Sequence, residues 1–231
     1  MDGNNRWARR SGVPGVLGHR AGVEAVRRAL EACNARGIKT LTLFAFSSEN
    51  WGRPEPEVRA LLALFVRYLR GEVKKLNEDG IRLKFIGRRD RFSPNLQKLM
   101  HHGETLTANN TEVTLVLAMD YGGRWDVTQA VRTIADAVAA GTLKTEDISE
   151  HTVADELLSN QFPEPDLCIR TGGNQRLSNF LLWEFAYTEF VFSDTLWPDF
   201  NECDLDAALN DFCQRDRRFG LRESDGRGQQ G

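Results

Sequence analysis

Apolar and polar positions along the chain follow two periods, which predict helices separated by short strands. Residues 21–36 carry apolar side chains at helical spacing, and residues 56–76 repeat that pattern after a proline-rich entry. Residues 39–46 alternate and then become fully apolar. That pattern is typical of a strand that is buried on both faces.

The alternation of helix and strand continues almost to the end of the chain. We expect strands at residues 81–87, 113–119, 166–169 and 190–192, and helices at residues 93–108 (capped by Ser93), 125–140 and 204–215. This order predicts an α/β fold: a single domain with a mostly parallel central β-sheet flanked by helices. A chain of 231 residues is long enough to bury such a core without disulfide bonds or a structural metal.

Composition limits the function classes and the domain organisation. No linker interrupts residues 1–220, which we expect to form one domain, whereas the polar, glycine-rich residues 221–231 are expected to be a disordered tail. The net charge of −3 argues against general affinity for nucleic acid. The sequence has no signal peptide and no apolar run of about 18 residues, so we expect a cytoplasmic protein that at most touches a membrane surface.

The four cysteines lack the spacing of a zinc site. Cys33, Cys168, Cys203 and Cys213 are far apart and lie in apolar or helical contexts. We therefore expect reduced, mostly buried thiols.

Ligands of such folds bind beyond the carboxyl ends of the strands, and two of these ends are unusually polar. One loop, after residue 46, holds Ser47, Ser48, Glu49, Asn50, Trp51 and Arg53. The other follows residue 169 and holds Arg170, Gly172, Gly173, Arg176 and Ser178. There the glycines would free backbone donors, the arginines add fixed charge, and Ser178 would cap an apolar helix. This loop predicts a phosphate cradle, and the alternative is a solvated turn.

Two carboxylates are candidates for a magnesium site beside that cradle. Asp2 is followed by Gly3, Asn4 and Arg6, although an Asp-Gly-Asn string is more often an ordinary turn. Glu189 lies in an apolar stretch, where it would need an ion partner or a metal unless it faces solvent. Magnesium takes one or two protein carboxylates together with substrate phosphates, so this pair would be enough.

Taken together, these segments resemble the bacterial cis-prenyltransferases that make undecaprenyl diphosphate. The matching segments follow that family's order over residues 1–220. They are residues 1–4, 18–19, 46–51 with 53–54, 121–126, 169–173, 178–183, 196–200 and 217–220.

The resemblance implies a reaction, its substrates and its cofactor. Isopentenyl diphosphate units would be condensed head to tail onto farnesyl diphosphate, each new double bond being cis, with Mg²⁺ as cofactor. The implied product is undecaprenyl diphosphate, the precursor of the lipid carrier for cell-wall peptidoglycan. The alternatives are a shorter cis-polyprenyl product or a non-catalytic prenyl-diphosphate-binding subunit of the same fold.

The resemblance also assigns roles to residues of this chain. Asp2 would hold the metal, with Glu189 as second ligand. Asn50 corresponds to the proton acceptor of the family. Because a neutral amide is a poor base, we expect Asn50 to position substrate instead. Arg218 would reach the active site of a neighbouring subunit in a homodimer, and product release would involve peripheral contact with the inner face of the plasma membrane. The allylic pocket would contain Gly3, Asn4, Arg6, Trp7 and His19, the isopentenyl pocket Arg170, Arg176 and Ser178, and a mobile loop between them Ser47, Ser48, Glu49, Trp51 and Arg53.

An apolar product tunnel is expected next to these pockets. Its candidate lining is Val23, Val26, Leu30, Ala45, Leu61, Leu64, Phe65, Leu69 and Val113, which could equally form an ordinary core. The small Ala45 favours a long product.

The chain departs from the family pattern at several positions. Asn5 replaces a common glycine, Gly15 a common arginine, and Asn174-Gln175 a more usual acidic-His pair. The family also places an apolar strand before the segment that begins with Met1. We therefore expect the catalytic Asp2 to sit on a loose end and the functional protein to begin upstream.

Overall fold

The computed structural model describes residues 1–215, and all its strand pairs are parallel. The five strands are β1 (Thr40–Ser47), β2 (Ile81–Ile86), β3 (Val113–Tyr121), β4 (Leu167–Arg170) and β5 (Glu189–Phe192). The first three form one sheet in the order β1-β3-β2, and β4 and β5 form a second sheet. The expected parallel α/β fold is confirmed, but within the described residues the sheet is in two parts.

Seven α-helices connect or flank these strands. They are α1 (Asn4–Arg10), α2 (Gly15–Ala35), α3 (Glu55–Glu78), α4 (Pro94–Leu106), α5 (Gly123–Ala139), α6 (Glu150–Asp155) and α7 (Glu202–Cys213). Short 3-10 helices are η1 (Ser48–Gly52), η2 (Thr145–Asp147), η3 (Glu184–Tyr187) and η4 (Trp197–Asp199). Ser93 caps α4 as expected, because its Oγ accepts a hydrogen bond from the Leu96 amide at 3.3 Å.

Strand β3 is central because it can be buried on both faces. Val113, Leu115, Leu117 and Met119 pack toward the helices, whereas Val116 belongs to a second apolar cluster on the other face. Each large apolar side chain buried in this way contributes about 1.5–3 kcal/mol to the stability of the fold. This burial explains the continuous apolar sequence of the strand.

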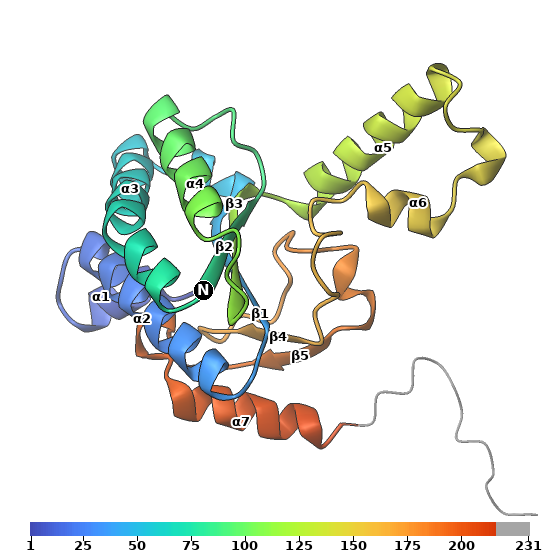
Figure 1. Ribbon diagram of the computed structural model, residues 1–231. Helices are drawn as coiled ribbons and strands as arrows, with labels where there is room; N and C mark the ends of the chain where they lie inside the picture. The colour runs from blue at the N-terminus through green and yellow to red at the C-terminus, as the bar shows by residue number, and fades with distance from the viewer. Residues whose placement is uncertain (216–231) are drawn as a thin grey trace, which may run out of the picture.

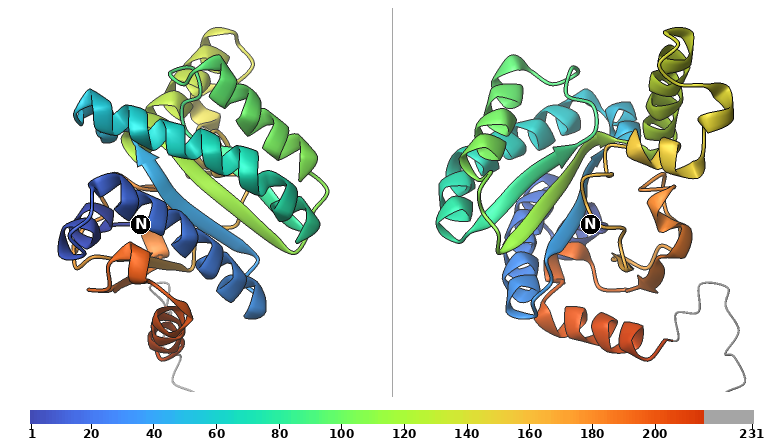
Figure 2. Two further views of the ribbon diagram at one scale, coloured as in Figure 1. Left: turned by 90° about the vertical axis from the view of Figure 1, so that its left-hand side faces the viewer. Right: turned by 45° about the vertical axis from the view of Figure 1, so that its right-hand side comes forward.

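The layers follow from this burial (Figures 1 and 2). Helices α2, α3 and α4 cover one face of the three-stranded sheet, and α7 packs below β5 and against α2. Helices α5 and α6 pack on each other and project away from the sheets (Figure 1). No helix in residues 1–215 is long and apolar enough to cross a membrane.

Two expectations from the sequence are wrong in this structure, and one helix was missed. No apolar helix follows Ser178: the backbone at Ser178, Asn179 and Leu181 has positive φ, and only the short η3 forms later. Helix α1, in contrast, was not expected. Of the four cysteines, all free, Cys203 and Cys213 are exposed because they lie on the outer turns of α7, so the thiols are not mostly buried.

The N-terminal segment is not a loose end. The Asp2 amide donates to Thr171 Oγ1 at 2.9 Å, and the Asp2 carbonyl accepts from Thr171 Oγ1 at 3.0 Å and from the Trp197 amide at 2.9 Å. These bonds fix Asp2 beside the end of β4. The assignment of residues 1–220 to one domain stays a prediction, and the expected tail, residues 221–231, lies outside the described residues.

Candidate active site

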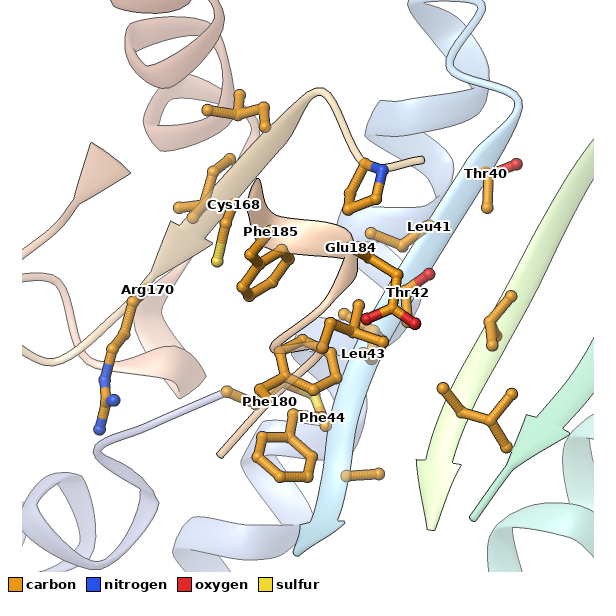
Figure 3. Close-up of a pocket in the computed structure, with 18 of the residues that line it drawn as sticks. Thr40, Leu41, Thr42, Leu43, Phe44, Cys168, Arg170, Phe180, Glu184 and Phe185 are labelled. Carbon is orange, nitrogen blue, oxygen red and sulfur yellow. The ribbon is translucent and has the colours of Figure 1, made fainter. Parts of the chain in front are cut away.

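A large pocket lies between β1 and β4, and its mouth gathers most of the predicted polar residues. Its volume is about 1350 Å³. Figure 3 shows residues 40–44 on β1 across from Cys168 and Arg170 on β4, with Phe180, Glu184 and Phe185 between the two strands in this view. The predicted site residues that line it are Asp2, Asn4, His19, Ser47, Glu49, Asn50, Arg53, Arg170, Arg176 and Ser178.

The Asp2 carboxylate is the anionic centre of the mouth. Its Oδ2 accepts hydrogen bonds from Asn174 Nδ2 at 2.8 Å and from Arg170 Nη2 at 3.1 Å, and Arg6 Nη2 lies 3.4 Å from Oδ1. Partial burial acts to raise the pKa of Asp2, but the hydrogen bonds and positive charges outweigh it and hold that pKa below its usual range. Asp2 is therefore a carboxylate at neutral pH.

Arg170 connects both halves of the predicted cradle. Besides Asp2, its guanidinium donates to Ser178 Oγ at 2.8 Å and to the Arg176 carbonyl. The Arg170 side chain is largely buried, and its Nε has no hydrogen-bond partner among the described residues. Arg176 is exposed at the same mouth. The serine thus orients an arginine instead of capping a helix.

The two glycines of this loop provide a tight turn and not free donors. Gly172 and Gly173 have φ of +81° and +71°, and their amides donate to the carbonyls of Thr195 and Ser193 at 2.8 and 2.9 Å. The expectation of free backbone N–H groups is therefore wrong. A side chain at Gly172 would meet Arg6 Nη2 at 2.5 Å, while Arg6 Nη1 donates to the Gly172 carbonyl at 2.6 Å. The turn holds Arg6 beside Asp2.

The loop after β1 folds as η1 and presents Asn50 to the pocket. Asn50 Oδ1 accepts from the Ser47 amide at 3.0 Å, which leaves the Nδ2 hydrogens of the same amide group for a ligand. Glu49 Oε1 accepts from Asn179 Nδ2 at 2.8 Å, and Asn179 Oδ1 accepts from the amide of Arg124 at 2.9 Å. Asn179 therefore ties this loop to the beginning of α5.

Trp51 and Ser48 of the same loop do not line the pocket. The Trp51 ring packs against Phe46 and Phe92, and the Arg91 guanidinium lies 4.6 Å above it. Its indole faces Asp120, which is fully buried. Burial raises the pKa of Asp120, although Trp51 and the charge of Arg91 act to lower it. Neither Trp51 Nε1 nor the Asp120 oxygens reach hydrogen-bond geometry with described residues. Ser48 lies close to Gly122, where an added Cβ would be 2.6 Å from Ser48 Oγ.

His19 and Arg53 form the opposite side of the mouth. Burial, together with the charge of Arg53, lowers the pKa of His19, so the imidazole is neutral at pH 7. Its Nε2 is buried without a hydrogen-bond partner among residues 1–215. Arg53 Nη1 donates to Glu57 Oε1 at 3.0 Å. A neutral imidazole and a guanidinium facing a pocket can both donate to phosphate oxygens.

Gly3 and Trp7 lie outside the pocket. Gly3 is buried at the start of α1 with φ of +105°, and an added Cβ would meet Leu196 Cδ2 at 2.8 Å, so its role here is backbone geometry. Trp7 Nε1 donates to Asp199 Oδ1 at 2.6 Å on the surface. Arg218 lies outside the described residues.

Asp2 and Glu189 are not brought together. Glu189 pairs in register with Leu167, three positions before the Arg170 that contacts Asp2, which is roughly 10 Å along a strand. Its carboxylate instead lies 2.9 Å from Arg215 Nη1. No cluster of three or more His, Cys, Asp or Glu side chains suited to a metal occurs in the described part of the chain. Of the two predicted metal ligands, only Asp2 lines the large pocket.

The apolar wall of the pocket contains part of the predicted tunnel. Val26, Ala45, Leu61, Leu64 and Phe65 line it. The other predicted lining residues, Val23, Leu30, Leu69 and Val113, are not among the lining residues, and the last three are buried in the core. The lining thus combines cationic side chains beside Asp2 with an apolar wall, and this combination suits a ligand with a phosphate head and an apolar tail.

Three residues that hold the site together were not predicted: Thr171, Asn179 and Glu57. Each makes a contact that is distant in sequence: Thr171 with Asp2, Asn179 with Glu49, and Glu57 with Asn5. The sequence signal for Thr171 was a hydroxyl directly after the predicted Arg170, and the structure shows this threonine to be 2% exposed and hydrogen-bonded, as buried polar groups usually are.

The structure defines a parallel α/β protein with a large pocket lined by arginines and apolar side chains, and comparison with known proteins identifies its family. The family described as "Putative undecaprenyl diphosphate synthase" matches residues 1–220. A Pseudomonas aeruginosa relative, the ditrans,polycis-undecaprenyl-diphosphate synthase specific for (2E,6E)-farnesyl diphosphate, is 54% identical over 95% of this chain and 88% of its own. The chain therefore belongs to the undecaprenyl diphosphate synthase family of cis-prenyltransferases.

Two solved structures share the fold. One is lavandulyl diphosphate synthase from Lavandula x intermedia in complex with dimethylallyl diphosphate, with a TM-score of 0.92 and 40% identity over 95% of both chains. The other is a probable undecaprenyl diphosphate synthase from Campylobacter jejuni, with a TM-score of 0.77 and 31% identity over 87% of this chain and 92% of that one. The same fold thus occurs in synthases named for different products.

Proposed function

We propose that this chain condenses isopentenyl diphosphate units onto farnesyl diphosphate to make undecaprenyl diphosphate. The observation that carries the proposal is the joining of Asp2, Arg170 and Ser178 in one hydrogen-bonded unit at the mouth of an apolar pocket. The 54% identity to a farnesyl-specific relative supports the choice of starter and product.

The reaction needs charge stabilisation more than covalent chemistry. The allylic C1–O bond breaks and leaves its electron pair on the diphosphate, C4 of the isopentenyl double bond attacks C1, and loss of a C2 proton forms the new double bond. His19 and Arg53 on one side of the mouth would bind the allylic diphosphate, and Arg170, Arg176 and Ser178 on the other the isopentenyl diphosphate. Donors held in place before the reaction stabilise the developing charge on the leaving group.

Asn50 serves in this proposal as a positioning donor. Its Oδ1 is occupied by the Ser47 amide, so the group that faces substrate is Nδ2, which donates and cannot take a proton. The diphosphate that has just left is a stronger base than a neutral amide and would receive the C2 proton. The hydrogen bond from Asn179 to Glu49 would hold the η1 loop in its position beside the pocket.

Magnesium is the proposed cofactor, and Asp2 is the residue whose surroundings fit it. Mg²⁺ prefers oxygen ligands and keeps most of its coordination for water and phosphate, so one partly exposed carboxylate between two diphosphate pockets is sufficient. When bound, the metal neutralises charge on the leaving diphosphate. Glu189 is ion-paired with Arg215, so we do not include it in the proposed metal site.

The assembly and location of the enzyme belong to the same proposal. A homodimer and a cytoplasmic location, with release of the lipid product at the inner face of the plasma membrane, are expected from the family resemblance. The experiment that tests the activity is incubation with farnesyl diphosphate and labelled isopentenyl diphosphate, with Mg²⁺ or with EDTA. Butanol-extractable label that depends on Mg²⁺ supports the proposal, whereas its absence would refute it.

A further inference from the structure

A single carboxylate oxygen joins three segments behind the allylic side of the mouth. Glu57, in the first turn of α3, accepts through Oε1 from Arg53 Nη1 at 3.0 Å and from Asn5 Nδ2 at 3.2 Å. Asn5 belongs to α1, directly after the segment that carries Asp2. The bond therefore connects the N-terminal segment, the end of the Asn50 loop and α3.

Gly15 makes room for the Asn5 side chain. A Cβ at Gly15 would lie 2.7 Å from Asn5 Oδ1, a distance that real Cβ contacts essentially never show. A larger residue at position 15 would force the Asn5 amide to shift, and this amide makes the contact with Glu57. The two departures from the usual family residues are thus coupled: the asparagine occupies the space that the glycine leaves open.

The position of this contact relates it to the substrate mouth. Asn5, Gly15, His19 and Glu57 all line a small cavity of about 280 Å³ next to the large pocket. His19 and Arg53 also line the large pocket itself. The Asn5–Glu57 contact therefore lies directly behind the two cationic or donating side chains proposed to bind the allylic diphosphate.

We infer that Asn5 is a positioning residue for the allylic diphosphate, acting through Glu57 on the Arg53 guanidinium. This inference rests on the proposed function. The Arg53–Glu57 pair is an i,i+4 contact with both side chains about one-third exposed, and such a pair alone holds an arginine only weakly. A second donor on the same oxygen restricts the carboxylate and therefore restricts the arginine. Because Gly15 controls the place of Asn5, the two positions should act as one unit.

The test is a double-mutant cycle on binding, with the full chain. The Kd of farnesyl diphosphate, measured by calorimetry without isopentenyl diphosphate so that no turnover occurs, is compared for the wild type, Asn5→Ala, Gly15→Ala and the double variant. We expect Asn5→Ala to weaken binding by about fivefold to tenfold, the effect of one hydrogen bond of ordinary strength, and Gly15→Ala to weaken it by no more than that. The double variant should be no weaker than Asn5→Ala, because the clash exists only when Asn5 is present.

Two further variants separate positioning from general damage to the fold. Asn5→Asp keeps the shape but places a carboxylate against Glu57, so it should bind more weakly than Asn5→Ala. Gly71→Ala, in α3 with no neighbouring atom within 4 Å of the added Cβ, should bind like the wild type. In steady-state turnover the KM for farnesyl diphosphate should rise while the KM for isopentenyl diphosphate changes less than about twofold.

Several outcomes would overturn the inference. They are unchanged binding in Asn5→Ala, additive effects in the double variant, an Asn5→Asp variant that binds as well as the wild type, or a wild type that does not bind farnesyl diphosphate. If the wild type binds with the expected dependence on Asn5 but transfers no isopentenyl units, the proposed activity fails while the positioning role stands. The two failures are thereby distinguished.

Discussion

Arg170 donates a hydrogen bond of 3.1 Å to the carboxylate of Asp2, although the two residues are 168 positions apart in the chain. The same guanidinium also donates hydrogen bonds to Ser178 Oγ and to the Arg176 carbonyl. The contact therefore joins the proposed metal-binding residue to the proposed isopentenyl diphosphate pocket. A change at Arg170 should affect both.

Arg170→Lys should lower kcat/KM for isopentenyl diphosphate by about 10²-fold or more. An ammonium group cannot donate to Asp2, Ser178 and the Arg176 carbonyl in the planar arrangement of a guanidinium. Steady-state kinetics at saturating farnesyl diphosphate measures the effect, and Arg132→Lys on the exposed side of α5 is the matched control. A lysine variant with nearly full activity would argue against the shared role.

Asn50→Asp should lose most of its activity, about 10²-fold in kcat/KM. The aspartate would keep an acceptor for the Ser47 amide, but it has no hydrogen to donate and adds charge beside the diphosphates. Asn109→Asp, at an exposed position after α4, controls for the added charge. Full turnover by Asn50→Asp would show that the amide donor is not required.

Ala45→Leu should shorten the product. Ala45 lines the pocket with Leu61, Leu64 and Phe65 from α3, so added volume there reduces the space for the growing chain. Chromatographic sizing of the extracted products measures the effect, with Ala139→Leu at the exposed end of α5 as the control. Unchanged product length would place the tunnel elsewhere.

The stability of the fold should decrease as pH rises through about 6, because of Asp126. This carboxyl group is 1% exposed, and burial raises its pKa to about 6 against hydrogen bonds from the Leu158 amide and the Tyr121 hydroxyl. Between its ordinary pKa, near 3.8, and about 6, the folded chain holds a proton that the unfolded chain has lost. The contribution of Asp126 is therefore complete below about pH 4 and lost above about pH 6.

Asp126→Asn should remove that dependence and raise the free energy of unfolding at pH 8 by roughly 1–3 kcal/mol. The amide can still accept from the Leu158 backbone and donate to the Tyr121 oxygen. Thermal unfolding at pH 5 and pH 8 measures it, and Asp136→Asn on the exposed side of α5 is the control. The idea fails if wild type and Asp126→Asn lose stability equally between the two pH values.

The strands could be predicted from the sequence because burial on both faces leaves a continuous apolar pattern, as in Val113–Met119. The conformation of the segment after Ser178 could not be predicted. Its backbone has positive φ at Ser178 and Asn179, which is unfavourable for residues other than glycine. Tertiary contacts such as that of Asn179 with Glu49 stabilise this conformation. Apolar composition alone does not distinguish such a segment from a helix.

Polar residues at strand ends predicted the place of the site better than the role of each member. Arg170 and Asn50 lie at the mouth as expected, but Trp51, in the same loop, turns away to pack against Arg91 and the buried Asp120. Arg91 and Asp120 lie near the ends of β2 and β3, far from the loop in sequence, so no local sequence pattern could predict these contacts. For the same reason, the contact of Glu57 with Asn5 was not predictable.

The mass of the product formed from farnesyl diphosphate, isopentenyl diphosphate and Mg²⁺ tests most directly whether this chain makes undecaprenyl diphosphate. We expect mass spectrometry of the extracted lipid to find undecaprenyl diphosphate as the main product, and none when EDTA replaces Mg²⁺. A single condensation product, or no product from an otherwise folded chain, would contradict it.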